Sequence, residues 1–360
     1  MKDYSRYISS VRRSVPAPRD LVDGDGSCVF GTFQDEFETM DLVSAKKPTH
    51  APQLMNRLKL TLWQATEVFL NEGILLSVVC DMGIFGKTLN VFYDKRTGYS
   101  HCWDTNLKSS DTVIAPNLLR GSVSEAHTPV SFVRYENSLD QGKIHLSGSH
   151  RDKDGWSISY DFELDRISRP SVVSIPFGLN RPLYSQKDFL KAAGTLTLNG
   201  EVFGTDDDAL AVMDDHRGFY PRRCHYDWVT TMGYLELDGK REPFALNLTR
   251  NQSVNQDDYN ENLIWLEGRT SLLPPVRFTR SVESADFRHG SIWTIRDDYD
   301  MVNLTFKVTD LSPMVMHALV VNIDYYIAYG VLNGYVRRED GTKYLIENMQ
   351  AMGEDKTMLL

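Results

Sequence analysis

Apolar and polar residues alternate along much of this chain, with the period of two that is typical of β-strands. In the segment 156–164 every second residue is apolar: Trp156, Ile158, Tyr160, Phe162 and Leu164. The residues between them are Ser, Asp and Glu, so one face of this strand is expected in a core and the other in water. The segment 302–308 alternates in the same way. The pattern predicts antiparallel sheets.

Short turn motifs separate the predicted strands. Asn199-Gly200, Asp238-Gly239 and Asp340-Gly341 are dipeptides that favour tight hairpins. The strands recur at roughly the 8–12-residue spacing that is typical of sandwiches and barrels. Strands do not alternate with helical segments along the sequence. We therefore expect an all-β fold and not a Rossmann or TIM-barrel architecture.

One segment has residues that typically begin and end a helix. Ser185 stands at an N-cap position, Asp188 at the matching capping-box position, and Gly194 at a stop. We expect a short helix over residues 185–193. A linker between two halves of the chain would fit at about residues 168–193.

The charge balance narrows the class of partner. The formal net charge is −10 and the isoelectric point is about 5.4, so a uniform basic surface for nucleic acid is not expected. No stretch of the sequence is long and apolar enough to span a bilayer, and the first residues lack the apolar core of a secretion signal. We expect a cytoplasmic protein with no nucleic-acid partner and no integral membrane segment. The sequence leaves the oligomeric state open.

Four cysteines, Cys28, Cys80, Cys102 and Cys224, form no C-x-x-C pair. Buried free thiols are therefore favoured over disulfides or metal ligands.

Acidic, histidine, arginine and aromatic residues crowd into the segment 194–280. On an extended backbone Asp214 and His216 point to one side, and Asp215 and Arg217 point to the other. An Asp beside a His in a poorly hydrated interior can serve as general acid and base, because burial and neighbouring charge move such pKa values toward the working range. The candidate catalytic residues are Asp214, Asp215 and His216.

The next strand of this segment has two faces as well. Its first face carries Arg222, Cys224, Tyr226 and Trp228, and its second carries Arg223, His225 and Asp227. Arginine suits an enolate, a phosphate or a carboxylate. The candidate substrate-binding residues are Arg217, Arg222, Tyr226, Trp228, Asn247, Glu261, Asn262 and Trp265.

These residues also have a structural interpretation. Antiparallel sheets often hold buried Asp–Arg and His–backbone bonds that fix strand register. Trp228, Trp265 and Asn247 would then be core and turn residues, and the pair Glu261-Asn262 would orient a loop. His216 and His225 with an Asp match no compact metal motif, so we expect neither a metal nor another cofactor.

Several motifs together resemble one family, in order along most of the chain. Residues 30–37, 57–63 and 93–98 resemble the first half of the domain of unknown function 2804 family. The motifs that resemble the second half of this family are Gly194-Thr-Leu-Thr-Leu-Asn-Gly, Asp215-His-Arg-Gly218 with Pro221, Asp227-Trp228, Leu246-Asn-Leu248, Glu261-Asn262 and Gly268-Arg269. The strand content is similar to that of the wider tandem lipocalin-like group, which includes carotenoid 1,2-hydratases, tocopherol cyclase, attH-type proteins and lipocalin-like cyclases.

The resemblance implies an all-β fold of two lipocalin-like antiparallel β-barrel (calycin-type) domains in tandem, with few short helices. We accordingly expect an N-terminal arm over residues 1–22, a first barrel over 23–180 and a second over 181–360. The catalytic residues of the hydratases and cyclases do not map onto this sequence, so no reaction is carried over.

Three functions compete. In the first, the protein is a cofactor-independent lyase or isomerase that hydrates, cyclises or isomerises a small hydrophobic, lipid- or terpenoid-like molecule in a barrel cavity. In the second it is a non-catalytic carrier of an apolar metabolite, which rests on fold analogy alone. The third is a structural or protein-partner role through exposed strand edges. The polar residues gather in the second half, so the site is expected there or at the junction of the halves.

Overall fold

The computed structural model describes residues 12–282, 290–318 and 321–359. Two compact units divide the chain. The N-terminal unit comprises residues 16–97 and 101–220, and the C-terminal unit comprises residues 221–360 together with 1–15 and 98–100. The predicted boundary between residues 180 and 181 lies inside the N-terminal unit, because the two long strands that follow it are hydrogen-bonded within that unit.

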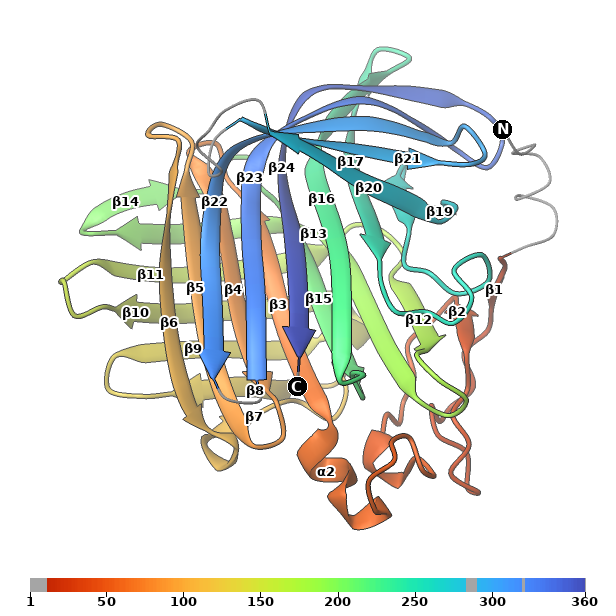
Figure 1. Ribbon diagram of the computed structural model, residues 1–360. Coiled ribbons are helices and arrows are strands. Elements are labelled where there is room, and N and C mark those ends of the chain that lie inside the picture. Colours follow the sequence, from red (N-terminus) through yellow and green to blue (C-terminus); the bar gives the residue numbers. More distant parts are fainter. Residues whose placement is uncertain (1–11, 283–289, 319–320, 360) are drawn as a thin grey trace. The chain divides into compact units, whose positions relative to one another are not determined.

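Antiparallel strands make up most of the N-terminal unit (Figure 1). They are β2 (Gly31–Phe33), β3 (Thr61–Phe69), β4 (Gly73–Asp81), β5 (Phe85–Asp94), β6 (Tyr99–Lys108), β7 (Thr112–Val113), β8 (Ser122–His127), β9 (Ser131–Ser138), β10 (Lys143–Arg151), β11 (Ser157–Arg166), β12 (Ser171–Pro176), β13 (Pro182–Leu198), β14 (Glu201–Gly204) and β15 (Leu210–Gly218). The main sheet follows the order β6-β5-β4-β3-β15-β13-β11-β10-β9-β8-β7.

This sheet rolls over on itself into a nearly closed barrel. In Figure 1 the orange strands β3–β6 cross the yellow-green strands β9–β11. Side chains bridge the two walls: Tyr160 of β11 donates to Asn90 of β5 at 2.7 Å, and Gln64 of β3 donates to Asn137 of β9 at 2.7 Å. The Tyr160 hydroxyl also lies 2.5 Å from Ser77 Oγ of β4. Alternate apolar residues such as Ile158, Phe162 and Leu164 fill the remaining interior.

The C-terminal unit is a second antiparallel sheet, curled into a half-barrel. Its main sheet runs in the order β19-β18-β17-β16-β24-β23-β22-β21-β20. The strands of the unit are β1 (Ser14–Val15), β16 (Arg223–Leu237), β17 (Lys240–Arg250), β18 (Leu263–Leu266), β19 (Arg269–Leu272), β20 (Val276–Val282), β21 (Ser291–Asp297), β22 (Val302–Ala318), β23 (Val321–Arg337) and β24 (Lys343–Leu359). Its core includes Val302, Leu304, Phe306 and Val308, as their alternation predicts.

Helical structure in the described residues is confined to short segments. They are the 3-10 helices η1 (Leu42–Ser44), η2 (Gln53–Met55), η3 (Ser109–Asp111) and η4 (Leu139–Gln141), and the α-helix α2 (Asn56–Lys59). None of the described helices has the length and apolar character needed to cross a bilayer. The predicted all-β fold, with two antiparallel barrel-like sheets and few short helices, is confirmed.

The helix and the linker expected before Gly194 are wrong. Residues 185–193 belong to β13, which is hydrogen-bonded to β11, β12 and β15. Ser185 caps nothing, and Asp188 forms a buried ion pair with Arg166 at 2.6 Å. β12 and the start of β13 also occupy the segment expected as a linker. The capping pattern is local and weak, and pairing with neighbouring strands overrides it.

The structure also tests the predicted hairpin turns and part of the predicted N-terminal arm. Each of the three hairpin dipeptides joins two paired strands, and the first two have positive φ at both residues (51° and 88°, then 50° and 77°). Trp156 is an exception to its alternating segment: it precedes β11 and is 46% exposed. Residues 1–11 of the predicted arm lie outside the described residues, whereas Leu21 and Val22 are buried in the N-terminal unit. The four cysteines are free thiols, as predicted, but only Cys80 and Cys224 are buried, whereas Cys28 and Cys102 are partly exposed.

Candidate functional site

The register of β13 against β15 gathers four polar side chains on one face of the N-terminal sheet. Ser185 lies opposite His216, and Lys187 lies opposite Asp214. Residues two apart on a strand share a face, so these two pairs are direct neighbours. We call Ser185, Lys187, Asp214 and His216 the Lys187 cluster.

The Lys187 ammonium is at the centre of this cluster. Its Nζ lies 2.8 Å from Asp214 Oδ1 and donates hydrogen bonds to Ser185 Oγ at 3.2 Å and His216 Nε2 at 3.1 Å. His216 Nε2 is also 2.8 Å from Ser185 Oγ and 3.4 Å from Asp214 Oδ1. The side chain of Lys187 is only 1% exposed, whereas that of His216 is 22% exposed. His216 is therefore the member of the cluster that a molecule from solvent meets first.

The geometry assigns complementary roles to these groups. An ammonium group only donates hydrogen bonds, so its bond to His216 Nε2 requires a lone pair on that nitrogen. The Nε2 nitrogen is thus held beside a cation, and Asp214 balances the charge of Lys187. A proton acceptor, hydrogen-bond donors and a carboxylate lie within hydrogen-bond reach of one another, which is the arrangement required for general acid–base chemistry.

Asp215 is separated from this cluster by the alternation of β15, as the sequence predicts. It lies on the opposite face with Arg217, whose Nε donates to Asp215 Oδ2 at 2.8 Å and whose Nη1 donates to the Pro116 carbonyl at 3.0 Å. That face also carries Met213 of the apolar core. Burial raises the pKa of Asp215, and the neighbouring Arg217 opposes the rise. The contacts of Asp215 and Arg217 are those of a structural ion pair within the barrel.

The same alternation gives the side of the sheet on which the candidate catalytic residues lie. Met213 and Ala211 point into the apolar core of the N-terminal barrel, so Asp214 and His216 point to its outer face. Two of the three candidate catalytic residues are therefore together, on the outside of the sheet, and the third is inside it.

The candidate binding residues of the C-terminal unit mostly satisfy one another. The Trp228 indole donates to Asn247 Oδ1 at 2.6 Å, and Asn247 Nδ2 donates to the Glu261 carbonyl at 2.9 Å. Asn262 accepts from the Thr249 amide at 2.7 Å and donates to the Pro274 carbonyl at 2.8 Å. Such contacts fix the connection between β17 and β18, which is what the structural interpretation expects.

The remaining candidates have different surroundings. Trp265 is fully buried in β18. Tyr226 of β16 donates to Glu354 of β24 at 3.0 Å. Arg222 is exposed at a bend before β16. Arg222, Tyr226 and Trp265 lie in the C-terminal unit and Arg217 in the N-terminal unit, and their role in binding stays a prediction.

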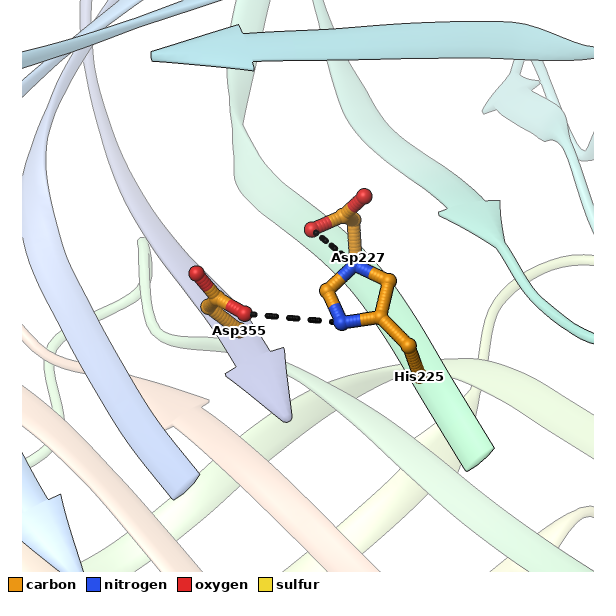
Figure 2. A group of neighbouring side chains, drawn as sticks. All are labelled: His225, Asp227 and Asp355. Carbon is orange, nitrogen blue, oxygen red and sulfur yellow. Dashed lines mark ion pairs between the residues drawn. The ribbon is translucent and has the colours of Figure 1, made fainter. Parts of the chain in front are cut away.

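A second polar cluster lies on the C-terminal sheet, and Figure 2 shows three of its members. His225 and Asp227 are two residues apart on β16, with Nε2 3.3 Å from Asp227 Oδ1. Asp355 lies on the neighbouring strand β24, 3.9 Å from His225 Nδ1. Arg280 of β20 pairs with both carboxylates and stacks 4.2 Å from the centre of the Trp293 ring. We call His225, Asp227, Arg280 and Asp355 the His225 cluster.

Neighbouring charges and burial shift the pKa values of the His225 cluster. The hydrogen bond to Asp227 raises the pKa of His225. Burial disfavours the charged form of Asp227, but the bonds from His225 and Arg280 outweigh it and lower its pKa. Burial raises the pKa of Asp355. One ligand atom from each of His225, Asp227 and Asp355 lies within 4.8 Å of the others, yet Arg280 already supplies the positive charge that both carboxylates need.

Sequence reasoning placed His225 and Asp227 on one face but missed the rest of this cluster. Arg280 and Asp355 are distant in the chain. Asp355 lies on β24, which pairs with β16, whereas Arg280 lies on β20 at the other end of the strand order and comes close because the sheet curls. Lys187 and Ser185 were missed for a different reason, since their segment was expected to be helical. The alternation of Ser185 and Lys187 opposite that of Asp214 and His216 was the available signal.

Comparisons with known proteins report on the family and on similar structures. A family model described as Domain of unknown function (DUF2804) matches residues 12–359. Among solved structures, kievitone hydratase from Nectria haematococca is 11% identical with a TM-score of 0.49, covering 83% of this chain and 88% of that one. A putative AttH from Nitrosomonas europaea is 11% identical with a TM-score of 0.43 and coverages of 84% and 93%. CghA is 9% identical with a TM-score of 0.42 and coverages of 97% and 96%.

No curated protein sequence matches the chain. The family model spans nearly all of the described residues, in agreement with the motifs in both halves of the sequence. The protein therefore belongs to the DUF2804 family.

Proposed function

We propose that this protein is a cofactor-independent enzyme that transfers a proton to or from a small, mainly apolar molecule at the Lys187 cluster. The observation that carries the proposal is the buried Lys187 ammonium, which contacts Asp214, Ser185 and the partly exposed His216. The reaction class is hydration, cyclisation or isomerisation of a lipid- or terpenoid-like molecule. Each of these needs an acid, a base and a poorly hydrated surface.

The energetics of the cluster support a functional role. Burying an ammonium and a carboxylate costs several kcal/mol of hydration per ion, and their attraction often does no more than offset that cost. An apolar pair at the positions of Lys187 and Asp214 would stabilise the sheet equally well. Buried charged groups of this kind gather at active sites, because catalysis requires charges that stability alone does not.

In the proposed isomerisation His216 Nε2 removes a proton from a carbon next to a carbonyl group, and the bonding pair moves to the carbonyl oxygen. When Nε2 takes the proton, the Lys187 N–H that had donated to this nitrogen is released, and Lys187 and Ser185 then donate hydrogen bonds to the oxyanion that forms. Asp214, 3.4 Å from Nε2, stabilises the imidazolium. The imidazolium, which is partly exposed, exchanges this proton with solvent and then delivers a proton to another carbon, so that no electron acceptor is needed and the enzyme is restored.

Hydration uses the same groups in a different order. Lys187 protonates one carbon of a double bond, and water adds to the other carbon as it loses a proton to His216. The imidazolium then returns that proton to Lys187, 3.1 Å away, which restores the enzyme. The balance is one water gained by the substrate. The measurable consequence is a product heavier than the substrate by one water, whereas isomerisation leaves the mass unchanged.

The test incubates the purified full-length chain with an extract of apolar metabolites and follows every compound by mass spectrometry and retention time. The wild type is compared with His216→Gln and with His145→Gln, which alters a histidine on β10 that is paired with Asp161 at the surface. Circular dichroism verifies that each variant is folded. We expect a compound to be consumed by the wild type and by His145→Gln, with the rate reduced at least a hundredfold in His216→Gln.

Equal consumption by His216→Gln would refute the assignment of His216. A metabolite that is retained in stoichiometric amount and released unchanged by all variants would instead support the carrier function. Asp214→Asn and Lys187→Met complete the set, and we expect each to lower the rate while leaving the mass of the product unchanged.

A further inference from the structure

A pocket of about 430 Å³ opens where β16 begins and β24 ends, next to the His225 cluster. Arg223 and His225 line it from β16, and Thr357, Met358 and Leu359 line it from β24. Figure 2 shows that His225 and Asp355 come from these two strands. The pocket is an open cleft, and its volume lies within the usual range for clefts that bind small molecules.

Strand register determines how the pocket is built. Arg223 lies opposite Leu359, and His225 lies opposite Thr357, so these four residues form a block on one face of the sheet. Along β16 the two basic residues are two positions apart, which corresponds to about 7 Å. A single carboxylate that binds the Arg223 guanidinium would lie beside the His225 ring, whose two nitrogens contact Asp227 and Thr357. Leu359, on the same face, supplies an apolar contact for the body of the same molecule.

The charges next to the pocket favour one negative group. With His225 protonated, the His225 cluster holds two cations and two carboxylates and is balanced. Among the described residues no carboxylate pairs with Arg223, which is exposed. One positive charge is therefore left without a partner at the rim. A singly charged carboxylate matches it better than a doubly charged phosphate does, and the planar guanidinium fits the planar carboxylate.

We propose that this pocket binds a small amphiphilic monocarboxylate, with its carboxylate between Arg223 and His225 and its apolar body against Leu359. The site is independent of the Lys187 cluster, because the two share no residue and lie in different units. It gives the C-terminal unit a ligand-binding role that the proposed proton transfer at His216 does not require.

The test of this site is a titration of the full chain with octanoate, in which calorimetry measures the affinity. Octanamide is the neutral probe of the same shape. We expect octanoate to bind at least tenfold more tightly than octanamide, and Arg223→Met to remove that difference. Arg269→Met is the matched control, because Arg269 is an exposed arginine of β19 in the same unit. It should leave the octanoate affinity unchanged.

Several outcomes would overturn the site. They are equal affinity for octanoate and octanamide, equal weakening by Arg269→Met, and the absence of octanoate binding at millimolar concentration. Binding of a divalent cation that His225→Gln abolishes, without octanoate binding, would mean that the cluster is a metal site instead. All of these results leave the turnover measured with His216→Gln unaffected, so the failure of one proposal does not resemble the failure of the other.

The pH dependence of binding provides a second readout. The groups that face His225 are Asp227 on its own strand, Asp355 on β24 and Arg280 on β20, with Asp324 of β23 near Asp355. The pKa of His225 is raised, so the imidazolium persists to higher pH than usual and is lost above that pKa. Octanoate affinity should therefore fall as the pH rises from about 6 to 9. His225→Gln should abolish this fall, and an unchanged fall in that variant would exclude His225 from the site.

Discussion

The stability of the N-terminal barrel should depend on pH through His150. This residue of β10 is 4% exposed and points into the barrel. Its Nε2 lies 2.9 Å from Thr105 Oγ1, and its Nδ1 lies 3.5 Å from Asn90 Nδ2. Neither neighbour is a carboxylate. Burial therefore lowers the pKa of His150 from 6.5 to about 4, although Asp104 and Asp152 act in the opposite direction.

The direction in which stability changes with pH follows from proton binding. Between the folded pKa of about 4 and the unfolded pKa of 6.5, the unfolded chain binds a proton at His150 that the folded chain does not. Stability from this residue is complete above the unfolded pKa and is lost progressively as the pH falls toward the folded pKa. The two pKa values correspond to a loss of about 2 kcal/mol between pH 7.5 and pH 5.

The assay is urea unfolding at both pH values, read by pulsed hydrogen exchange and mass spectrometry of peptides from β10 and β11. Peptide resolution separates this barrel from the C-terminal unit, whose own titrations would otherwise contribute. In His150→Asn the decrease in unfolding free energy between pH 7.5 and 5 should be smaller than in the wild type by about 2 kcal/mol. In His145→Asn, on the same strand but at the surface, the decrease should remain close to that of the wild type. An equal decrease in wild type and His150→Asn would refute the reasoning.

Two further predictions concern the cores of the two units. Gly148→Ala would place a methyl carbon 2.2 Å from the Tyr160 hydroxyl, so it should destabilise the barrel by about 2–3 kcal/mol in urea unfolding, whereas Ser149→Ala on the exposed face should have little effect. Asn247→Ala would leave the buried Trp228 indole without its acceptor. It should cost about 1–3 kcal/mol of the unfolding free energy of the C-terminal unit, and a loss below 0.5 kcal/mol would show that the bond is replaced by another partner.

Strands with one buried face could be predicted from the sequence, because apolar residues alternate with polar residues where one face is buried and the other is exposed. The Asn-Gly and Asp-Gly hairpins could be predicted for a similar reason, since their backbone needs positive φ. β13 could not be predicted in this way. Its residues are buried on both faces from Pro182 to Leu190, so the period of two disappears and weak capping signals at Ser185 and Gly194 remain.

The candidate sites could likewise be predicted only in part. The faces of β15 and β16 follow from residue parity, which correctly separated Asp214 and His216 from Asp215. Which strand lies beside β15 depends on sheet topology, and without it Lys187 had no visible relation to His216. Asp355 and Arg280 reach His225 through strands that are far apart in the sequence. Single-sequence patterns carry the orientation of side chains within a strand but not the order of strands in a sheet.

The most direct test of proton transfer at His216 is the incorporation of solvent deuterium into a product. The turnover found with the metabolite extract would be repeated in D₂O, with the product examined for deuterium at carbon. The account predicts one deuterium at a carbon position with the wild type, and a rate of incorporation at least a hundredfold lower with His216→Gln. A product that forms without carbon-bound deuterium under conditions of full solvent exchange, or that incorporates it equally fast with His216→Gln, would contradict the proposed chemistry at this cluster.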